Sequence, residues 1–164
     1  MLKLVQKWII QIWTNGGDIL KYKSIEYAYK ILQVYGALCK PLCQEIKMPQ
    51  TAFDILMFLA NNPEYNTARD IVEVRKIKAN LVSINVDKLV QEGFLERQPM
   101  ENDRRKTKLI CTEKAQPIID KGHKLQENFI EKLFENIDEN SRVIFKRTIE
   151  DIETNLNKLM KGWE

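Results

Sequence analysis

The chain has little of what most catalytic and metal sites require. Its 164 residues include one histidine, His123, and three cysteines, Cys39, Cys43 and Cys111, which form no metal-binding framework. With only six glycines, the chain also has no glycine-rich phosphate loop, and it shows no Ser/His/Asp or Cys/His pattern of a nucleophilic enzyme. We therefore expect neither an enzyme nor a bound metal or other cofactor.

Long hydrophobic runs are also missing. The apolar N-terminal segment LKLVQKWIIQIW is interrupted by lysines and glutamines, falls far short of the roughly 20 apolar residues of a membrane span, and is followed by no small-residue cleavage site. We expect it to form an amphipathic leader helix that packs on the protein, in preference to a helix on a membrane surface. An odd number of cysteines without a signal peptide fits the reducing cytosol, so we expect a cytoplasmic protein with no membrane partner.

What is present describes one globular domain with an uneven charge. Hydrophobic residues make up 44% of the chain and charged residues 30%, and the formal net charge is only +3. Residues 66–112 alone carry a net +3, residues 1–65 carry +2 and residues 113–164 carry −2. The basic middle of the chain indicates where a nucleic-acid partner would bind.

Apolar periodicity predicts a mostly helical chain. Residues 18–43 predict a long helix, and Pro41 should kink or end it. This helix is apolar on two adjacent stripes, so it should be covered on two sides, and in so small a chain a second subunit can provide one cover. A second helix should start near Pro49 and stop at Asn61-Asn62-Pro63.

The middle of the chain predicts two short helices and a hairpin. Thr67-Ala68-Arg69-Asp70 has the spacing of a capping box and should open a helix that runs to about Val74. A turn at 75–77 leads to a helix over about 78–91 that Gly93 stops. Strands are expected at 94–98 and 107–112, joined by a charged loop at 99–106. Two further helices follow, one over 118–133 and one through 149–159. Residues 136–141 separate them.

This order of elements is that of a winged helix-turn-helix. The second helix of such a motif is narrow enough to enter the DNA major groove, with its N-terminal residues nearest the base edges. Arginines on the hairpin, or wing, can reach phosphates or the minor groove.

The wing carries a more specific signal. Gly93-Phe94-Leu95-Glu96-Arg97, then Asp103-Arg104-Arg105, then Leu109-Ile110-Cys111-Thr112 resemble the wing signature of the MarR family of bacterial transcription factors. The resemblance extends over nearly the whole chain after about residue 18. It implies a mainly α fold with a small β-hairpin wing, in which a winged helix-turn-helix lobe at 47–112 is flanked by dimerisation helices within 1–46 and 113–164. It also implies a homodimer that binds double-stranded DNA and regulates transcription, most often as a repressor, relieved by a small-molecule effector or another signal.

The resemblance also implies which residues contact DNA. Asp103 would orient a wing-tip arginine, either Arg104 or Arg105. The remaining implied contacts are the groove-facing positions Lys78, Ala79, Asn80, Leu81, Ser83, Ile84 and Lys88 and the phosphate contacts Arg75, Lys106 and Lys108. The family usually has a polar residue at the position of Ile84 and an apolar one at Asn85, so either the register shifts by one residue, or Ile84 meets a thymine methyl group while Asn85 packs at an edge.

Three alternatives stay open at this point. Cys39 and Cys43 could sense oxidants, although a buried structural role is favoured for cysteines on an apolar stripe. Four tyrosines of the first long helix could line an effector pocket, although an aromatic stripe is more often core: Tyr22, Tyr27, Tyr29 and Tyr35. The chain could also be a winged-helix module that binds protein rather than DNA, but such a module has no need for basic residues concentrated at 69–108.

Overall fold

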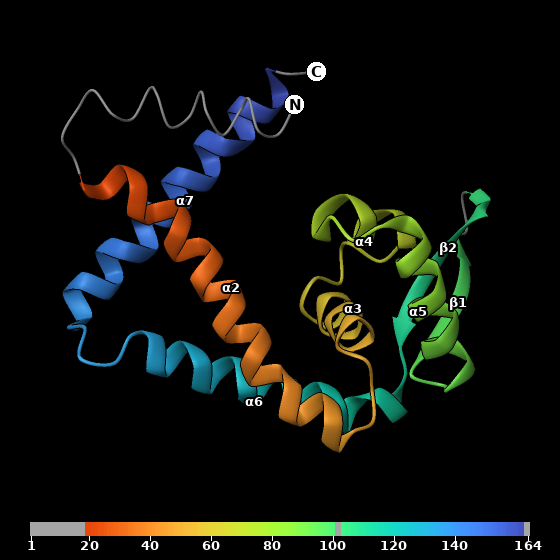
Figure 1. Cartoon of the computed structure of the whole chain (residues 1–164). Helices are drawn as coiled ribbons and strands as arrows, with labels where there is room; N and C mark the ends of the chain where they lie inside the picture. Colours follow the sequence, from red (N-terminus) through yellow and green to blue (C-terminus); the bar gives the residue numbers. More distant parts are fainter. Residues whose placement is uncertain (1–18, 101–102, 163–164) are drawn as a thin grey trace. The chain divides into compact units, whose positions relative to one another are not determined.

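The computed structural model describes the backbone of residues 19–100 and 103–162, and the side chains over 26–100 and 107–162 (Figure 1). The segment expected to form an N-terminal leader helix lies outside the described residues. The chain divides into two compact units, Met1–Gly122 and His123–Glu164. The domain boundaries expected from the sequence stay a prediction.

The fold class expected from the sequence is confirmed: the described chain is mainly helical with one small β-hairpin. The elements in chain order are α2 (Ile19–Glu45), α3 (Gln50–Asn61), α4 (Ala68–Arg75), α5 (Ala79–Gln91), β1 (Leu95–Met100), β2 (Asp103–Cys111), a 3-10 turn (Glu113–Ala115), α6 (Gln116–Leu133) and α7 (Glu139–Lys161). The long helices α2, α6 and α7 therefore flank a central helix-turn-helix and hairpin.

Helix α3 lies at the centre of the first unit. It contacts α2, α5 and β2, and seven of its residues are buried, with Phe53, Ile55 and Leu56 fully enclosed. An almost wholly apolar helix of this kind must be covered on several sides. Further large side chains that are fully or nearly fully enclosed in this unit are Cys39, Ile71, Val82, Val86, Leu89 and Leu95.

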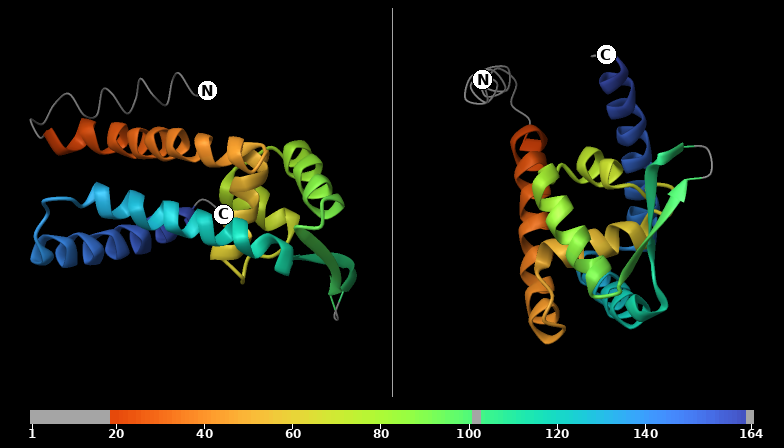
Figure 2. Two further views of the ribbon diagram at one scale, coloured as in Figure 1. Left: turned by 90° about the horizontal axis from the view of Figure 1, so that it is seen from below. Right: turned by 90° about the vertical axis from the view of Figure 1, so that its right-hand side faces the viewer.

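The two strands form an antiparallel hairpin that lies beside α5 (Figures 1 and 2). Leu95 pairs with Cys111 and Pro99 with Thr107, and the register then shifts so that Met100 pairs with Asp103. The inner side chains Leu95 and Leu109 are buried, whereas residues 96–99 are exposed. Burial at the base of the hairpin therefore fixes which face points outward.

Some sequence-based boundaries were wrong. The expected end near residue 43 was wrong: α2 continues past Pro41 to Glu45, because a proline inside a helix removes only its own backbone hydrogen bond. The expected loop at 99–106 is mostly strand, since β1 extends to Met100 and β2 starts at Asp103. Helix α7 begins at Glu139, inside the expected linker, because the Asp138 carboxylate accepts a hydrogen bond from the Ser141 backbone N–H at 3.0 Å.

Two of the four tyrosines expected to lie in the core depart from that expectation. Tyr27 and Tyr29 are 56% and 71% exposed in the single chain, so they are not part of its core. Among the described residues, α3 covers part of this helix near its C-terminal end, and most of the apolar side chains of its stripes stay exposed in the single chain.

The second unit is built from the end of α6 and all of α7. The Phe134 and Phe145 rings meet edge to face at 5.3 Å. Arg142 lies over the Phe134 ring and donates hydrogen bonds to the carbonyls of Phe134 and Ile137, at 2.7 and 2.8 Å. These contacts fix the turn between the two helices.

Gly122 lies where α6 contacts α3. It is buried in α6, and a Cβ at this position would overlap the Met57 sulfur and lie 2.7 Å from the Met57 methyl carbon and 3.2 Å from the Phe53 ring. A side chain at this position would require Met57 and Phe53 to move. A hydrogen bond of 2.6 Å from the Lys121 ammonium to the Glu45 carboxylate holds the neighbouring turn of α6 to the end of α2.

We expect Gly122→Val to destabilise the protein by about 1–3 kcal/mol, because the added methyl groups force Met57 and Phe53 out of well-packed positions. Urea denaturation gives the loss of free energy of unfolding. Lys124→Val, at an exposed position of the same helix, measures the helix propensity of valine alone and should cost no more than about 0.7 kcal/mol. If adding Met57→Ala restores none of the loss, the steric explanation is wrong.

Candidate nucleic-acid interface

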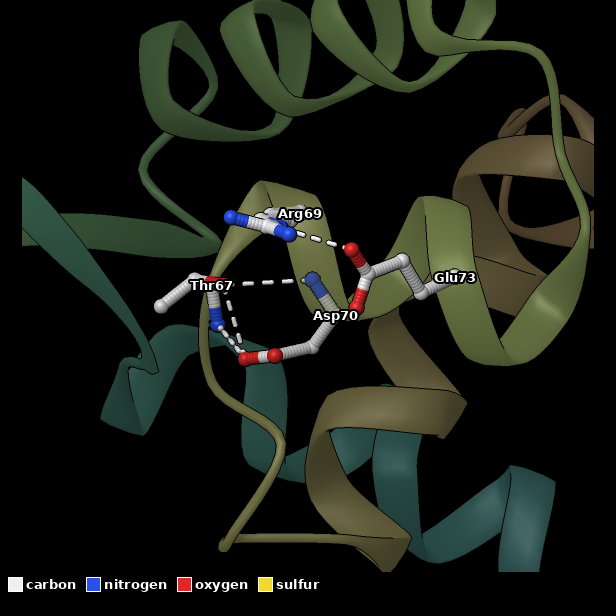
Figure 3. A network of polar contacts seen from close by, with 4 residues as sticks. All are labelled: Thr67, Arg69, Asp70 and Glu73. Carbon is white, nitrogen blue, oxygen red and sulfur yellow. Dashed lines mark hydrogen bonds and ion pairs between the residues drawn. The ribbon is translucent and has the colours of Figure 1, made fainter. Parts of the chain in front are cut away.

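The first helix of the central motif starts at a reciprocal capping box (Figure 3). The Thr67 hydroxyl oxygen accepts a hydrogen bond from the Asp70 backbone N–H at 3.2 Å, and the Asp70 carboxylate accepts from the Thr67 backbone N–H at 2.8 Å. The Thr67 hydroxyl also donates to that carboxylate at 2.7 Å. These bonds satisfy helix-end donors that would otherwise lack partners, as the sequence predicts.

A short turn joins the two helices of the motif. Helix α4 ends at Arg75, and Lys76 adopts a left-handed conformation with φ of 53° that reverses the chain. Lys78 then opens α5 in an extended conformation, and its carbonyl accepts from the backbone N–H groups of Leu81 and Val82, at 2.9 and 3.0 Å. In contrast to α4, no described side chain caps the start of α5.

Helix α5 is sharply divided into a buried and an exposed face. Val82, Asn85, Val86 and Leu89 are buried against the rest of the unit. Of the seven residues implied by the family resemblance to face the groove, six are exposed and Lys88 is half-buried: Lys78, Ala79, Asn80, Leu81, Ser83, Ile84 and Lys88.

The packing settles which of the two sequence registers the helix adopts. Ile84 is 62% exposed, whereas Asn85 is only 9% exposed. The Asn85 amide donates a hydrogen bond of 2.8 Å to the Leu81 carbonyl, one turn earlier, and this satisfies one of its donors in the core. The polar residue therefore lies inside and the apolar residue outside, with no shift of register.

Sequence reasoning missed an ion pair between α5 and the hairpin. Asp87 lies on the exposed side of α5, and its carboxylate pairs with the Arg97 guanidinium from β1. Arg97 was noted only as part of the wing signature. The fixed Gly-x-x-x-Arg spacing after α5 was the available signal, but nothing in the sequence pairs this arginine with Asp87.

Other charges are distributed around the edges of the motif. Arg69 pairs with Glu73 at 2.6 Å on the exposed side of α4, and the Lys88 ammonium lies 3.8 Å from the Glu92 carboxylate. Arg75, Lys76 and Lys78 form an exposed basic cluster at the turn, hereafter the turn cluster, and none of them forms an ion pair with another described residue.

Asp54 on α3 faces this region from the core. Burial raises the pKa of its carboxyl group, and the nearby positive charge of Arg75 partly offsets that rise. The positive charge of Arg75 therefore interacts with the Asp54 carboxylate, although the Arg75 side chain is exposed.

The base of the hairpin is tied to the end of α5. Gly93 makes the turn with φ of 76°, and its carbonyl accepts a hydrogen bond of 2.7 Å from the Thr112 hydroxyl. The Lys114 ammonium donates to the Glu92 carbonyl at 2.7 Å and lies 5.0 Å above the Phe94 ring. These contacts fix the base of the hairpin relative to the C-terminal end of α5.

The tip of the hairpin is described only in part. Asp103, Arg104, Arg105 and Lys106 lie on the backbone of β2, and their side chains fall outside the described residues. Lys108, farther along the strand, is half-buried.

A cavity of about 390 Å³ lies between α4, α5 and the hairpin. Its lining is mainly apolar, with the arginines Arg69 and Arg97 and the hydroxyls of Ser83 and Thr107 as its polar members. Ala79 and Ser83, two residues expected to face the groove, border this cavity.

Cys39 and Cys43 lie in the core on α2, outside this motif, whereas Cys111 is the last residue of β2. Cys39 and Cys43 are buried, and burial raises the pKa of both thiols, that of Cys43 to about 11. Burial also raises the pKa of Cys111, which is half-buried. No described group of three His, Cys, Asp or Glu side chains is placed to hold a metal ion. Over the same residues, no helix combines the length and the apolar composition of a membrane span.

Helix α4, the three-residue turn, the half-exposed helix α5 and the hairpin define a winged helix-turn-helix protein. Residues 46–106, which span this motif, match the model of the MarR family. This match covers the DNA-binding motif, and the described chain is similar in fold to MarR transcriptional regulators.

Solved structures show the same fold. A MarR transcriptional regulator from Methanosarcina mazei Go1 is 26% identical, with a TM-score of 0.64 over 84% of this chain and 96% of its own. A MarR protein from Peptoclostridium difficile is 15% identical, with a TM-score of 0.72 over 91% and 97%. A MarR family regulator from Listeria monocytogenes, solved in complex with a 26mer DNA, is 16% identical, with a TM-score of 0.68 over 86% and 90%. No curated protein sequence matches the chain.

We expect Thr67→Ala to lower the free energy of unfolding by about 1 kcal/mol, because it removes the side-chain half of the capping box. Thr67→Ser keeps the hydroxyl and serves as the matched control, with a loss of no more than a few tenths of a kcal/mol. Urea denaturation of the three proteins measures both effects. Equal losses for the serine and alanine variants would show that the methyl group, and not the hydrogen bond, stabilises this helix end.

Cys39 and Cys43 should react slowly with iodoacetamide in the native protein at pH 8. The thiolate is the reactive form, and a pKa near 11 for Cys43 leaves roughly one thiol in a thousand ionised, in addition to the steric protection of burial. Mass spectrometry of the alkylated peptides should show both residues reacting more than about tenfold faster in urea. Rapid native labelling of either residue would instead support oxidant sensing.

Proposed function

We propose that the chain is a cytoplasmic, homodimeric regulator of transcription that binds double-stranded DNA through α5 and the hairpin. It acts as a repressor, and a small-molecule effector or another signal releases it from DNA. The observation that carries this proposal is the exposed face of α5, which the core leaves open along one side of the helix next to a hairpin rich in arginine and lysine.

The distribution of polar groups fits a duplex. Asn80 and Ser83 offer hydrogen-bonding side chains on the exposed face of α5, near its N-terminal end, which enters the groove first in helix-turn-helix proteins. The turn cluster flanks that end, and cations beside a recognition helix meet phosphates. The Listeria monocytogenes relative with this fold was solved with DNA bound, which supports the same partner here.

Exposed apolar residues support the dimer. On α2 these are Tyr27, Tyr29, Ile31, Leu32, Val34 and Leu38, and on α7 they are Val143, Ile144, Phe145, Ile149, Ile152, Leu156, Leu159 and Met160. Many large apolar side chains exposed on one helix favour association with a partner that covers them. A dimer with two-fold symmetry would present two α5 helices to successive major grooves, with half-sites about 34 Å apart.

The cavity between α4, α5 and the hairpin supports control by a small molecule. Its volume of about 390 Å³ falls in the range of small-molecule sites, and it touches both elements that would contact DNA. A ligand there could act only through different affinities for the free and the DNA-bound arrangements of these elements.

The combined substitution Arg104→Ala and Arg105→Ala should weaken DNA binding about tenfold or more, since phosphate contacts supply much of the affinity. Each lost phosphate contact should also reduce the slope of log K against log salt by about 0.9. Gel-shift titrations at several salt concentrations, on a site selected from random duplexes, measure both quantities. The melting temperature should not change.

Lys146→Ala with Arg147→Ala is the matched control, because it removes the same charge from exposed positions of α7. This control should leave DNA affinity within about twofold of the original. Unchanged binding by the hairpin variant would exclude the wing from DNA recognition. Failure of the original protein to bind any duplex in a salt-dependent way would favour the alternative of a protein-binding module.

A further inference from the structure

The exposed face of α5 carries a large apolar side chain that the core does not explain. Ile84 is 62% exposed and Leu81, one turn earlier, is 42% exposed, whereas the helix has other apolar residues fully buried on its opposite side. The inward-facing position beside Ile84 is taken by a polar residue, Asn85, so the sequence places the apolar residue outside and the amide inside. Packing within the chain accounts for Asn85 but not for Ile84.

The same helix has no arginine, and arginine makes the commonest base-specific contact, to guanine. Its one cation, Lys88, is half-buried and lies near the Glu92 carboxylate. Its one carboxylate, that of Asp87, pairs with Arg97 and so has a partner other than a cytosine amino group. The charged side chains of α5 therefore do not provide a strong contact to a G·C pair.

The remaining groups suit A·T pairs. Asn80 lies one turn before Ile84, and a carboxamide can bond the N6 and N7 groups of adenine together. The 5-methyl group of thymine is the one apolar feature at the base edges of the major groove, and an exposed aliphatic side chain is its natural contact.

We propose that Ile84 is a specificity-determining residue that reads the 5-methyl group of a thymine in each half-site. This inference rests on the proposed function, because it needs α5 in the major groove. It adds the base that the helix distinguishes and the group by which it does so.

The test replaces the methyl group and the side chain in turn. Duplexes bound by the full-length protein are selected from a random pool, and each thymine of the selected site is then replaced singly by deoxyuridine, which lacks only the methyl group. We expect one thymine in each half-site at which the replacement weakens binding about fourfold, the value of one buried methyl-sized group.

The Ile84→Ala variant should bind the thymine and deoxyuridine duplexes equally at that position, with the affinity that the original protein has for the deoxyuridine duplex. Ile84→Val keeps an aliphatic contact and should retain most of the discrimination. Val74→Ala removes a comparably exposed aliphatic group from α4 and should leave the ratio unchanged. Since Ile84 is exposed, all variants should melt at the temperature of the original protein.

The outcomes separate the two claims. Sequence-specific binding with no thymine sensitive to the replacement, or an Ile84→Ala variant that keeps the original ratio, would overturn the methyl contact and leave the proposed function standing. Absence of binding to every duplex would overturn both.

Discussion

The burial of one face of α5 against the rest of its unit is the constraint on which the other features depend. Val82, Val86 and Leu89 are nearly or fully enclosed, and α5 packs on α3 and β1. Because a helix repeats every 3.6 residues, fixing these positions also fixes which residues point away from the core. Asn80 and Ile84 are exposed for this reason, and the surface offered to a partner is a consequence of hydrophobic packing.

The charges around this face are arranged so that one set of residues could hold the DNA backbone and another could contact the bases. The middle of the exposed face is nearly neutral, since Asp87 is paired with Arg97 and Lys88 lies near Glu92. The turn cluster lies at one end of α5, and the basic residues of β2 follow in the adjacent hairpin. In a complex with DNA, cations at the edges would hold phosphates without specifying a sequence, and the neutral centre would contact bases.

Local sequence signals predicted the fold well where a single short-range interaction decides it. The Thr67–Asp70 capping box was found because its spacing is itself the mechanism, and Gly93 was found because its positive φ requires glycine. The start of α7 was missed, although Asp138 is a good cap, because the polar run around it looks like a loop. The strand ends at Met100 and Asp103 were missed because backbone pairing extends a hairpin regardless of how polar its side chains are.

The candidate site also contains features that the sequence could predict and one that it could not. The family resemblance implied the groove-facing residues of α5, and it left the placement of Ile84 and Asn85 open. That question depended on whether a buried amide finds a hydrogen-bond partner, which the Leu81 carbonyl provides. The Asp87–Arg97 pair could not be predicted, because it depends on how β1 turns back beside α5, a tertiary relation that no local pattern contains.

Helix α7 connects the proposed function to stability. It is 23 residues long, and none of them is buried in the single chain, although it displays a row of large apolar side chains. A solitary helix gains little from its backbone hydrogen bonds, so most of its stability must come from covering that row. If a second subunit provides the cover, folding of this helix and pairing of the chains become one equilibrium that depends on protein concentration. Two α5 helices at the spacing of successive major grooves then exist only in the paired state. Any signal that loosens the pairing would therefore lower DNA affinity without touching α5.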